Sequence, residues 1–509
     1  MRALAGHAGE HERGAGGGGV GCPRIRAGGR HGPVPQLAGP DVLGEDQTTL
    51  HLVDMGNEAV GELYQSRGYP PMSHPSTDPA ATSVAAWFAG LRPPHPGTAR
   101  ILEIGCASGH NLLPLAARWP GALCTGADIS EEAIAQARRR AAEAGIRNVS
   151  FIAADLRDLD FSGQEFDFII AHGVFSWVAD DAKKALLELC ARHLSPSGTA
   201  TISFNLRAGW EKRLPVVAAA RRIMEEHGVD VVKALAILRE VMAEHPDIIA
   251  IIDDMLVKGG EILTFDDFAP MNDPWPLDSF AAAAVSCGLR WLGDSNPAEN
   301  IPSSLDDAAR ETLAPLVGDP LRMQMTADAM AERTFRSGLL CRADAPVSQR
   351  MTTGMVMELA VRPQEVRPAG ISPSLKDFLE ALDSFRPDSV PVAEVLEKMG
   401  AADLPAMAKK VFQEITRGHL RARIEPVRIM KGMERPRLDP FRLLCAREHI
   451  PLVDAWHAPC LFTEKIWPLL AEIDGTKTEV ELAGIARRLC PDLAFPVWLR
   501  HLEERGMFA

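Results

Sequence analysis

Ionisable side chains recur at or near the ends of short apolar segments in the first half of the chain, namely Glu103, Asp128, Asp155 and His172. Carboxylates accept hydrogen bonds from hydroxyl and amino groups, and a histidine takes up or releases a proton near neutral pH. Gathered in one place, these side chains would bind a polar ligand and help a proton transfer beside it. The segments that precede them indicate how the chain brings them together.

The stretch at 99–109, ARILEIGCASG, is the one around which the rest is organised. An apolar run of strand character ends at Gly105, and Gly109 precedes a segment typical of a helix start. Glycine suits such a turn because its backbone, without a Cβ, can approach a ligand closely. The spacing E-x-G-x-x-x-G differs from the G-x-G-x-x-G of dinucleotide sites, and no G-K-[ST] follows. This departure favours a ligand without a pyrophosphate, with S-adenosylmethionine (SAM) as the leading candidate.

Further apolar segments alternate with helical ones after this turn. With the first strand at 100–105, they predict strands at 122–130, 149–156, 166–178 and 199–206. Five right-handed β/α units predict a doubly wound parallel sheet, which binds ligands at the carboxyl ends of its strands. The residues at or near those ends are Glu103, Gly105, Gly109, Asp128, Asp155 and His172.

Two carboxylates have the spacing expected for an adenosine site. Asp128 ends the second predicted strand, where an acid accepts hydrogen bonds from both ribose hydroxyls. The alternative is that Asp128 or Ser130 merely caps the following helix. Asp155 ends the third strand, where it would accept the adenine amino group while Leu156 packs on the ring.

Length and composition bound the possibilities. A chain of 509 residues, 46% hydrophobic and 24% charged, predicts two or three globular domains. A net charge of −14 argues against a general nucleic-acid binder. Nine cysteines without a C-x-x-C pair indicate a reducing, cytoplasmic compartment, and no apolar run reaches membrane-spanning length. No spacing of metal ligands is found, so no metal is predicted.

The N-terminal region divides into two parts. Residues 1–54, rich in glycine, proline, arginine and histidine, indicate a disordered tail or a misplaced translation start, with Met55 as the alternative initiator. Residues 55–98 form an entry segment with a helix that begins at Pro79. Tyr64 and Tyr69 lie in it, either packed against the first helix or folded over the ligand as a lid.

The motifs at 99–206 resemble a class I SAM-dependent methyltransferase: LEIGCASG, GADIS, AADL and LSPSGTATIS. The segments GCASGHNLLPLA, AHGVFSWV, SFNLRAGW and STDPAATSVAAWFAGLRPP are similar to the subfamily with a methyltransferase regulatory domain. That subfamily includes bacterial protein-lysine methyltransferases that act on outer-membrane proteins. The resemblance spans about 64–509 and implies a seven-stranded Rossmann-like domain and SAM as cofactor. STDP and SFNLRAGW depart from the subfamily's usual pattern on the substrate side, which affects substrate identity more than SAM binding.

From the motifs and the resemblance together, we predict a set of cofactor-binding residues. They are Tyr69, Thr77, Glu103, Gly105, Cys106, Ala107, Gly109, Asp128, Ile129, Asp155, Leu156 and His172.

The region after the fifth strand predicts packed amphipathic helices at 207–287, a helical insertion that would cap the substrate entrance. The methyltransferase core, 55–206, would resume at 288–345 with strands at 288–295 and 333–342. Asp266, Asp267, Asn272 and Asp273 lie in the exit loop of the insertion, either as a solvated loop or as a docking surface for a lysine ammonium.

The C-terminal part begins after a polar, proline-rich linker at 343–370. Residues 371–509 predict a mainly α, winged-helix-like module. Winged helices often bind DNA, but this one is not conspicuously basic, which favours interaction or dimerisation. His457 is interpreted as a packing histidine rather than a functional one.

Methyl transfer from a sulfonium requires that the nucleophile be aligned and water excluded. No [DN]-P-P-[YF] motif, the signature of amide or base-amine methylation, follows the fourth strand. A lysine amine must lose its proton first, and His172, Asp180 or an aspartate of the 266–273 loop would assist. Alternatively, His172 touches the amino-acid part of SAM or a backbone carbonyl. Phe175 and Trp177 are candidates for the channel of an alkyl stem, with Asp266 and Asp267 as the substrate acids; Trp177 is equally typical of core.

Three functions remain open from the sequence. The leading one is methyl transfer to a protein lysine, which rests on the resemblance alone. The second is methyl transfer to a small-molecule acceptor, and the third is a non-catalytic SAM-binding regulator. No nucleic-acid or membrane partner is expected, and a homodimer is an open alternative for the assembly.

Overall fold

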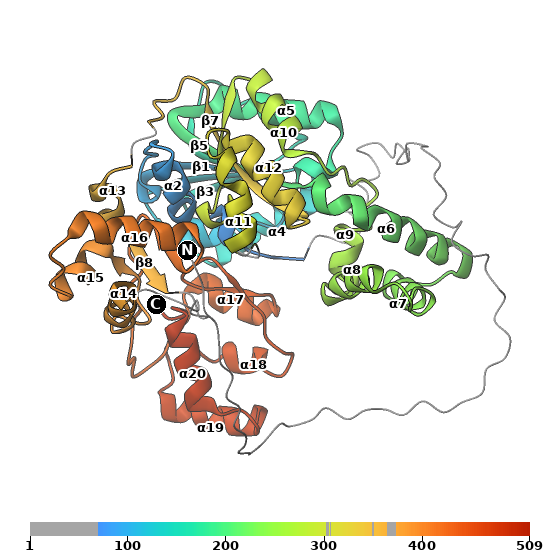
Figure 1. Cartoon of the computed structure of the whole chain (residues 1–509). Helices are drawn as coiled ribbons and strands as arrows, with labels where there is room; N and C mark the ends of the chain where they lie inside the picture. The colour runs from blue at the N-terminus through green and yellow to red at the C-terminus, as the bar shows by residue number, and fades with distance from the viewer. Residues whose placement is uncertain (1–69, 302–304, 306, 349–350, 364–372) are drawn as a thin grey trace, which may run out of the picture. The chain divides into compact units, whose positions relative to one another are not determined.

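Seven strands form one mixed sheet in the order β3-β2-β1-β4-β5-β7-β6. The computed structural model describes residues 70–301, 305, 307–348, 351–363 and 373–509 (Figure 1). The strands are β1 (Arg100–Ile104), β2 (Leu123–Asp128), β3 (Val149–Ala153), β4 (Phe166–Ala171), β5 (Leu194–Asn205), β6 (Leu289–Asp294) and β7 (Phe335–Arg342). All run parallel except β7, which pairs antiparallel with both β5 and β6. The doubly wound seven-stranded sheet is confirmed, with one reversed strand.

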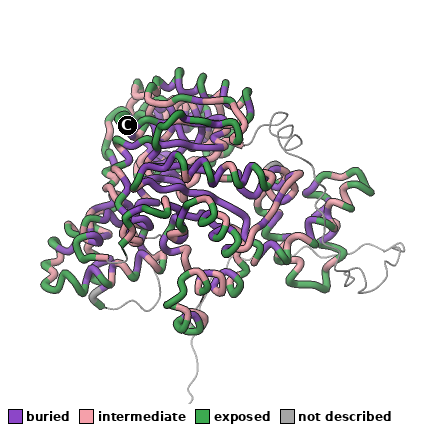
Figure 2. The backbone as a smooth tube through the Cα atoms, turned by 90° about the horizontal axis from the view of Figure 1, so that it is seen from above, coloured by how far each residue is buried: buried purple, intermediate pink, exposed green. Residues whose placement is uncertain are grey.

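The central strands are apolar on both faces because helices cover the sheet on both sides. In β1, Ile101 packs into one hydrophobic cluster, whereas Leu102 and Ile104 belong to the cluster on the opposite face. This alternation follows the two-residue period of a strand. Figure 2 shows the resulting buried backbone at the centre of the described chain.

The helices of this domain follow the predicted β/α order. They are α2 (Pro79–Phe88), α3 (Leu112–Arg118), α4 (Glu131–Glu143), α5 (Asp180–His193), α10 (Leu277–Ser286), α11 (Asp307–Leu313) and α12 (Pro320–Met330). In α4, Ile134, Ala137 and Ala141 recur at helical spacing and form the buried face. The helix begins at the Ser130 cap and ends before Gly145, whose φ is +69°.

A helical insertion separates β5 from α10. Its helices are α6 (Arg207–His227), α7 (Val231–Val241), α8 (Pro246–Val257) and α9 (Gly260–Phe265). They enclose a hydrophobic cluster of their own, in which Trp210, Leu235 and Met255 are buried. Because α9 ends at Phe265, the acidic residues that follow lie where the insertion returns to the sheet domain (Figure 1).

The C-terminal region begins with a small helical unit around a three-stranded sheet, β10-β8-β9. Its elements are α13 (Thr353–Glu358), β8 (Ala360–Pro363), α14 (Pro373–Asp383), β9 (Val390–Pro391), α15 (Val392–Lys398), α16 (Leu404–Thr416) and β10 (Leu420–Arg423). The order from α14 to β10 fits the winged-helix-like expectation. The third strand, β8, and α13 come from the stretch interpreted as a linker, so that interpretation is wrong for 353–363.

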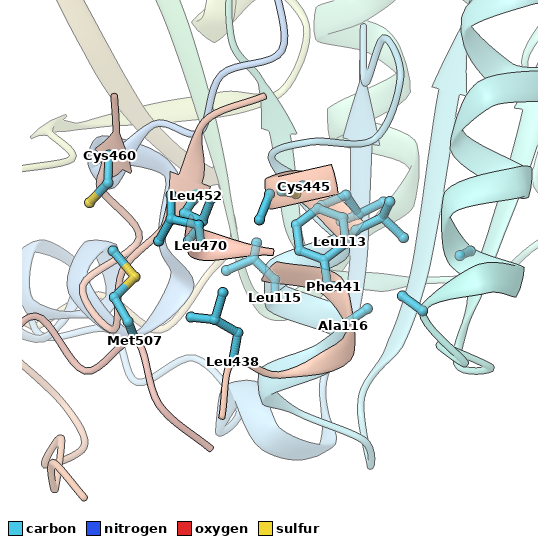
Figure 3. Packing of buried hydrophobic residues seen from close by; sticks show 14 of the residues in the cluster. Leu113, Leu115, Ala116, Leu438, Phe441, Cys445, Leu452, Cys460, Leu470 and Met507 are labelled. Carbon is cyan, nitrogen blue, oxygen red and sulfur yellow. The ribbon is translucent and has the colours of Figure 1, made fainter. Parts of the chain in front are cut away.

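The last part of the chain packs on the sheet domain itself. Its elements are α17 (Pro440–Glu448), β11 (Leu452–Val453), β12 (Pro459–Cys460), α18 (Trp467–Leu470), α19 (Glu479–Leu489) and α20 (Phe495–Glu504). Leu113 and Ala116 of α3 share one hydrophobic cluster with Phe441 and Cys445 of α17 (Figure 3). This half of the C-terminal module is therefore joined to the sheet domain by a continuous core.

Two strand boundaries differ from the predicted ones by more than three residues. The fourth strand ends at Ala171 rather than at 178, because Gly173 has a φ of +69° and a 3-10 turn, η5 (Phe175–Trp177), follows. The fifth strand begins at Leu194, because the S-P-S-G sequence continues it through an irregularity in the pairing with β4. The interpretation of 1–54 and the roles of Tyr64 and Tyr69 fall outside the described residues.

Candidate functional site

A cavity opens at the carboxyl ends of the parallel strands, beneath the segment at 70–74 and beside the end of α9. Eleven of the predicted site residues line it: Glu103, Gly105, Cys106, Ala107, Asp128, Ile129, Asp155, Leu156, His172, Trp177 and Asp266. The other predicted residues within the described chain are not among its lining residues, namely Thr77, Gly109, Phe175, Asp180 and Asp267.

The glycine turn is fixed by its own backbone bonds. The N–H groups of Gly105 and Cys106 both donate to the carbonyl oxygen of Ala127 in β2. Gly105 has a φ of +73°, and a Cβ on it would lie 2.4 Å from Cγ2 of Val174. Only glycine fits at this position, which brings the turn close to the loop after β4.

Gly109 has a structural role in the same turn. Its φ is +77°, and a Cβ there would lie 3.2 Å from atoms of Leu113, Ala137 and Phe151. These neighbours belong to α3, α4 and β3, so Gly109 allows close packing of the helices and the sheet. Gly109 therefore acts through the packing around the turn and does not itself line the cavity.

Asp128 holds the turn from the end of β2. Its Oδ2 accepts the N–H of Ala107 at 2.8 Å, and its Oδ1 accepts the N–H of Ser130 at 2.9 Å. Burial raises the pKa of this carboxyl above its usual range. The cap of α4 is Ser130, whose Oγ accepts the N–H of Ala133, so Asp128 is not the capping residue.

Glu103 is a buried acid at the end of β1. Its Oε1 accepts a hydrogen bond from Nδ2 of Asn111 at 2.7 Å, whereas its Oε2 has no hydrogen-bond partner among the described residues. Burial raises the pKa of Glu103 to about 8, and the nearby carboxylate of Asp128 adds to the shift. The carboxyl therefore has an acceptor oxygen to offer to a ligand in the cavity.

Asp155 remains charged at the end of β3. Its carboxylate forms an ion pair with Arg157 at 2.7 Å and accepts the backbone N–H of the same residue. The Arg157 guanidinium holds the pKa of Asp155 below its usual range. Arg157 also pairs with Asp181 of α5 at 2.8 Å, which ties the end of β3 to that helix.

Beyond β4, the imidazole of His172 stacks on that of His74, with ring centroids 3.7 Å apart. Burial lowers the pKa of His74 to about 4 and that of His172 well below its usual value. Nδ1 of His172 is buried and has no hydrogen-bond partner among the described residues. Trp177 is 5% exposed and contributes to the wall of the cavity.

Neighbouring residues of the predicted substrate set are separated by the fold. Phe175 is fully buried against Phe204, Trp275 and Phe280, and therefore belongs to the core. Asp180 lies in the first turn of α5, where its carboxylate pairs with Lys183.

The two predicted substrate acids also differ in position. The Asp267 side chain is fully buried and pairs with Lys258 at 2.6 Å and Arg213 at 3.2 Å. Asp266 lines the cavity and shares the ammonium of Lys258 at 3.2 Å. Only Asp266 of this pair therefore lines the cavity.

Two family models match this chain. Residues 101–198 match a methyltransferase domain, and residues 260–342 match a predicted methyltransferase regulatory domain. The chain carries a class I SAM-dependent methyltransferase domain. The first match runs from β1 to the beginning of β5, and the second runs from α9 to the end of β7.

Related proteins share sequence or fold with longer parts of this chain. An uncharacterized protein of Rickettsia prowazekii is 28% identical over 315 residues, 58% of this chain and 55% of its own length. A second one is 38% identical over 147 residues, 29% of this chain and 59% of its own length. The chain thus matches less than two thirds of these relatives. PKMT2 of Rickettsia typhi, solved with AdoHcy, shares the fold over 86% of this chain and 99% of its own, with a TM-score of 0.76 and 20% identity.

The residues of the methyltransferase cavity fit SAM, the cofactor of this domain. SAM presents an ammonium, two ribose hydroxyls and an adenine amino group, all of which donate hydrogen bonds. The cavity offers carboxyl acceptors for these donors, namely the free Oε2 of Glu103 and the carboxylates of Asp128 and Asp155. The turn at Gly105, without a Cβ, leaves the backbone open to the ligand.

Among the lining residues that the sequence did not predict, two contact Glu103 and His172 directly. Asn111 bonds to Glu103, and its polar side chain at the start of the apolar helix NLLPLA was a usable signal. His74, stacked on His172, carries no local signal, because its partner lies almost a hundred residues away.

Among the described residues, no helix is long and apolar enough to cross a membrane. The same part of the chain contains no group of three or more His, Cys, Asp or Glu side chains placed to hold a metal ion.

Proposed function

We propose that this protein is a SAM-dependent methyltransferase whose acceptor is the amine of a protein lysine. The observation that carries the proposal is that a neutral histidine, His172, and an acid, Asp266, both line the wall of the SAM cavity. The fold shared with PKMT2, a name that points to protein-lysine methylation, supports the same acceptor.

Asp266 has the chemistry to recognise a cationic side chain. Its carboxylate comes from the end of α9, within the stretch that matches the regulatory domain. Burial raises its pKa above the usual range, since Lys258 compensates only part of the cost of burying the charge. A second ammonium beside Asp266 would stabilise the charged carboxylate further.

His172 and Trp177 act on the amine after it has lost its proton. The neutral imidazole accepts a hydrogen bond through its free Nδ1, which can orient an amine N–H. Trp177 supplies an apolar wall for the alkyl stem and excludes water.

Bound SAM supplies a methyl group on a positively charged sulfur. The lysine nitrogen uses its lone pair to form the new bond to that carbon, while the carbon–sulfur electron pair leaves with AdoHcy. A proton leaves the ammonium to solvent before the attack. The chain's contribution is alignment, desolvation and removal of competing water.

Transfer of labelled methyl from SAM by the full chain tests the proposal. A cell extract is divided into protein and small-molecule fractions, and each is offered to the wild type and to Asp128→Ala. We expect wild-type-dependent label in the protein fraction, mapped to lysine by mass spectrometry. Label only in small molecules would replace the proposal with metabolite methylation. No transfer despite measured AdoHcy binding would favour a non-catalytic regulator.

A further inference from the structure

We propose that the loop 454–458 of the C-terminal module supports the SAM site from outside the cavity, and that His457 is a positioning residue for Asn111. The loop is the tip of the hairpin formed by β11 and β12. It contacts the methyltransferase domain at Asn111, which lies 346 residues before His457 in the sequence. The C-terminal module thereby acts on cofactor binding, beyond any role in partner binding.

The contact is a buried hydrogen bond between the two parts. His457 is fully buried, and its Nε2 lies 2.8 Å from Oδ1 of Asn111. Because Oδ1 is an acceptor, Nε2 carries the proton and donates. Nδ1 of His457 is buried without a hydrogen-bond partner among the described residues, which fits the neutral Nε2–H form.

Asn111 in turn forms hydrogen bonds to residues in and next to the cavity. Its Oδ1 also accepts the backbone N–H of His74 at 2.8 Å, and its Nδ2 donates to Glu103 at 2.7 Å and to Thr77 at 3.1 Å. With donors gathered around Oδ1, the amide turns its NH₂ toward the carboxyl of Glu103. Removing the His457 donor weakens that preference and leaves an under-satisfied buried oxygen.

The same loop is anchored at a second point below the entry segment. Arg118 of α3 donates to the carbonyl oxygen of Ala455 at 2.9 Å and pairs with Asp78 at 2.9 Å. Arg423 of β10 also lies 3.2 Å from Asp78. Asp78 caps α2 directly after the 70–77 segment, so the anchors hold the cover of the cavity as well.

Apolar packing makes the loop a fixed part of the domain. Leu113, Leu115 and Ala116 of α3 pack with Leu452 and Cys460 of the hairpin in one cluster (Figure 3). A hairpin seated on this core has little freedom to move away from Asn111. Its backbone at His457 has a φ of +64°, a conformation that the surroundings must maintain.

Binding of SAM and docking of the hairpin are therefore coupled, and each favours the other. This inference rests on the SAM site and not on the identity of the methyl acceptor. It can be tested with AdoHcy alone, so that its failure is distinct from a failure of the proposed lysine activity.

A matched pair of variants isolates the hydrogen bond. His457→Gln and His457→Met place unbranched side chains of similar length at the same positive φ, but only glutamine can donate. We expect the Kd of AdoHcy, measured by calorimetry on the full chain, to rise about threefold to tenfold in the methionine variant. The glutamine variant should stay within about twofold of the wild type. Because the methionine variant leaves Oδ1 of Asn111 short of a donor, it should unfold at a lower temperature, so both affinities are measured well below that midpoint. Equal affinities for the two variants would overturn the positioning role.

Hydrogen exchange of the wild type tests the coupling without any substitution. We expect AdoHcy to slow exchange of amides in residues 452–460, whereas α19, which does not line the cavity, serves as the internal control. Unchanged exchange in the hairpin at saturating AdoHcy would overturn the coupling. Because the experiment uses the wild type, its result does not depend on whether the variants fold.

Discussion

The imidazole ring of His172 lies against that of His74, with centroids 3.7 Å apart and an angle of 25° between the planes. Burial lowers both pKa values, so neither ring is charged at neutral pH. Moving a proton from a lysine ammonium, with a pKa of about 10.4, to an imidazole below 6.5 would cost more than about 5 kcal/mol. His172 is thus suited to accept a hydrogen bond from an amine and unsuited to remove its proton.

Replacing His172 should separate these two roles. We expect His172→Asn, which keeps a hydrogen-bond acceptor, to lower kcat by less than about tenfold. His172→Phe, which keeps a ring to stack on His74, should lower kcat by about a hundredfold, while the Kd of AdoHcy changes little. Steady-state kinetics with labelled SAM and calorimetry give both quantities.

The pH profile supplies the control for His172. Because the pKa of His172 lies below the working range, kcat of the wild type and of His172→Asn should depend on pH in the same way near pH 6.5. An inflection there in the wild type alone would mean that His172 titrates as a base during turnover.

Replacing Asp128 should weaken cofactor binding much more than it lowers the stability of the fold. Asp128→Ala removes the acceptor for Ala107 and the acid expected to meet the ribose, so we expect at least about a hundredfold loss of AdoHcy affinity. Asp167→Ala is the matched control. That carboxylate also accepts two hydrogen bonds, from Arg100 and Ser195, but lies at the opposite end of the sheet. Similar affinities in the two variants would contradict the position of the ribose site.

Glu103 should make the stability of the ligand-free protein depend on pH. Its pKa rises from about 4.5 to about 8 on folding, so between these values the folded protein holds a proton that the unfolded chain has lost. The free energy of unfolding then falls with rising pH, by at most about 1.4 kcal/mol per unit, and levels off above pH 8. Glu103→Gln, which does not titrate, should remove this slope in denaturant unfolding measured at pH 5, 6.5 and 8.

The same acid should release a proton when ligand binds. An ammonium beside Glu103 favours its charged form, so AdoHcy binding at pH 7 is expected to expel up to one proton. Calorimetry in two buffers of different ionisation enthalpy measures this release, which should be absent in Glu103→Gln. Binding without proton release by the wild type would show that the ammonium lies elsewhere.

Much of the methyltransferase domain was predictable because its signals are local. The strand period, the glycine turn and the spacing to Asp128 all act within a single β-α-β unit. The reversal of β7 has no such signal, because the direction of a strand depends on the connection that leads to it, here from β6 through α11 and α12. The irregular start of β5 is likewise set by pairing with β4 rather than by its own S-P-S-G sequence.

The site residues that could not be predicted likewise depend on turns or on partners that are distant in the sequence. Phe175 and Trp177 are two residues apart, yet one packs in the core and the other lines the cavity, because η5 turns them to different sides. His457 was interpreted as a packing histidine. Its burial fits that interpretation, but its partner, Asn111, lies in another part of the chain and gives no local pattern.

The adjacent acids at the end of α9 provide the sharpest test of acceptor docking. Both pair with Lys258, but Asp266 lines the cavity while Asp267 is enclosed between Lys258 and Arg213. We expect Asp266→Asn to raise the KM of a lysine acceptor peptide about fivefold to tenfold with an unchanged thermal unfolding midpoint. Asp267→Asn should instead cost about 2–4 kcal/mol of stability, because it removes the buried carboxylate that Lys258 and Arg213 share, and should alter KM little at a temperature where the variant is folded. The peptide is taken from the protein labelled in the transfer experiment, and kinetics are paired with thermal unfolding. If Asp266→Asn leaves KM unchanged, the acid does not meet the acceptor, and if Asp267→Asn raises KM without loss of stability, the docking surface extends past the cavity wall.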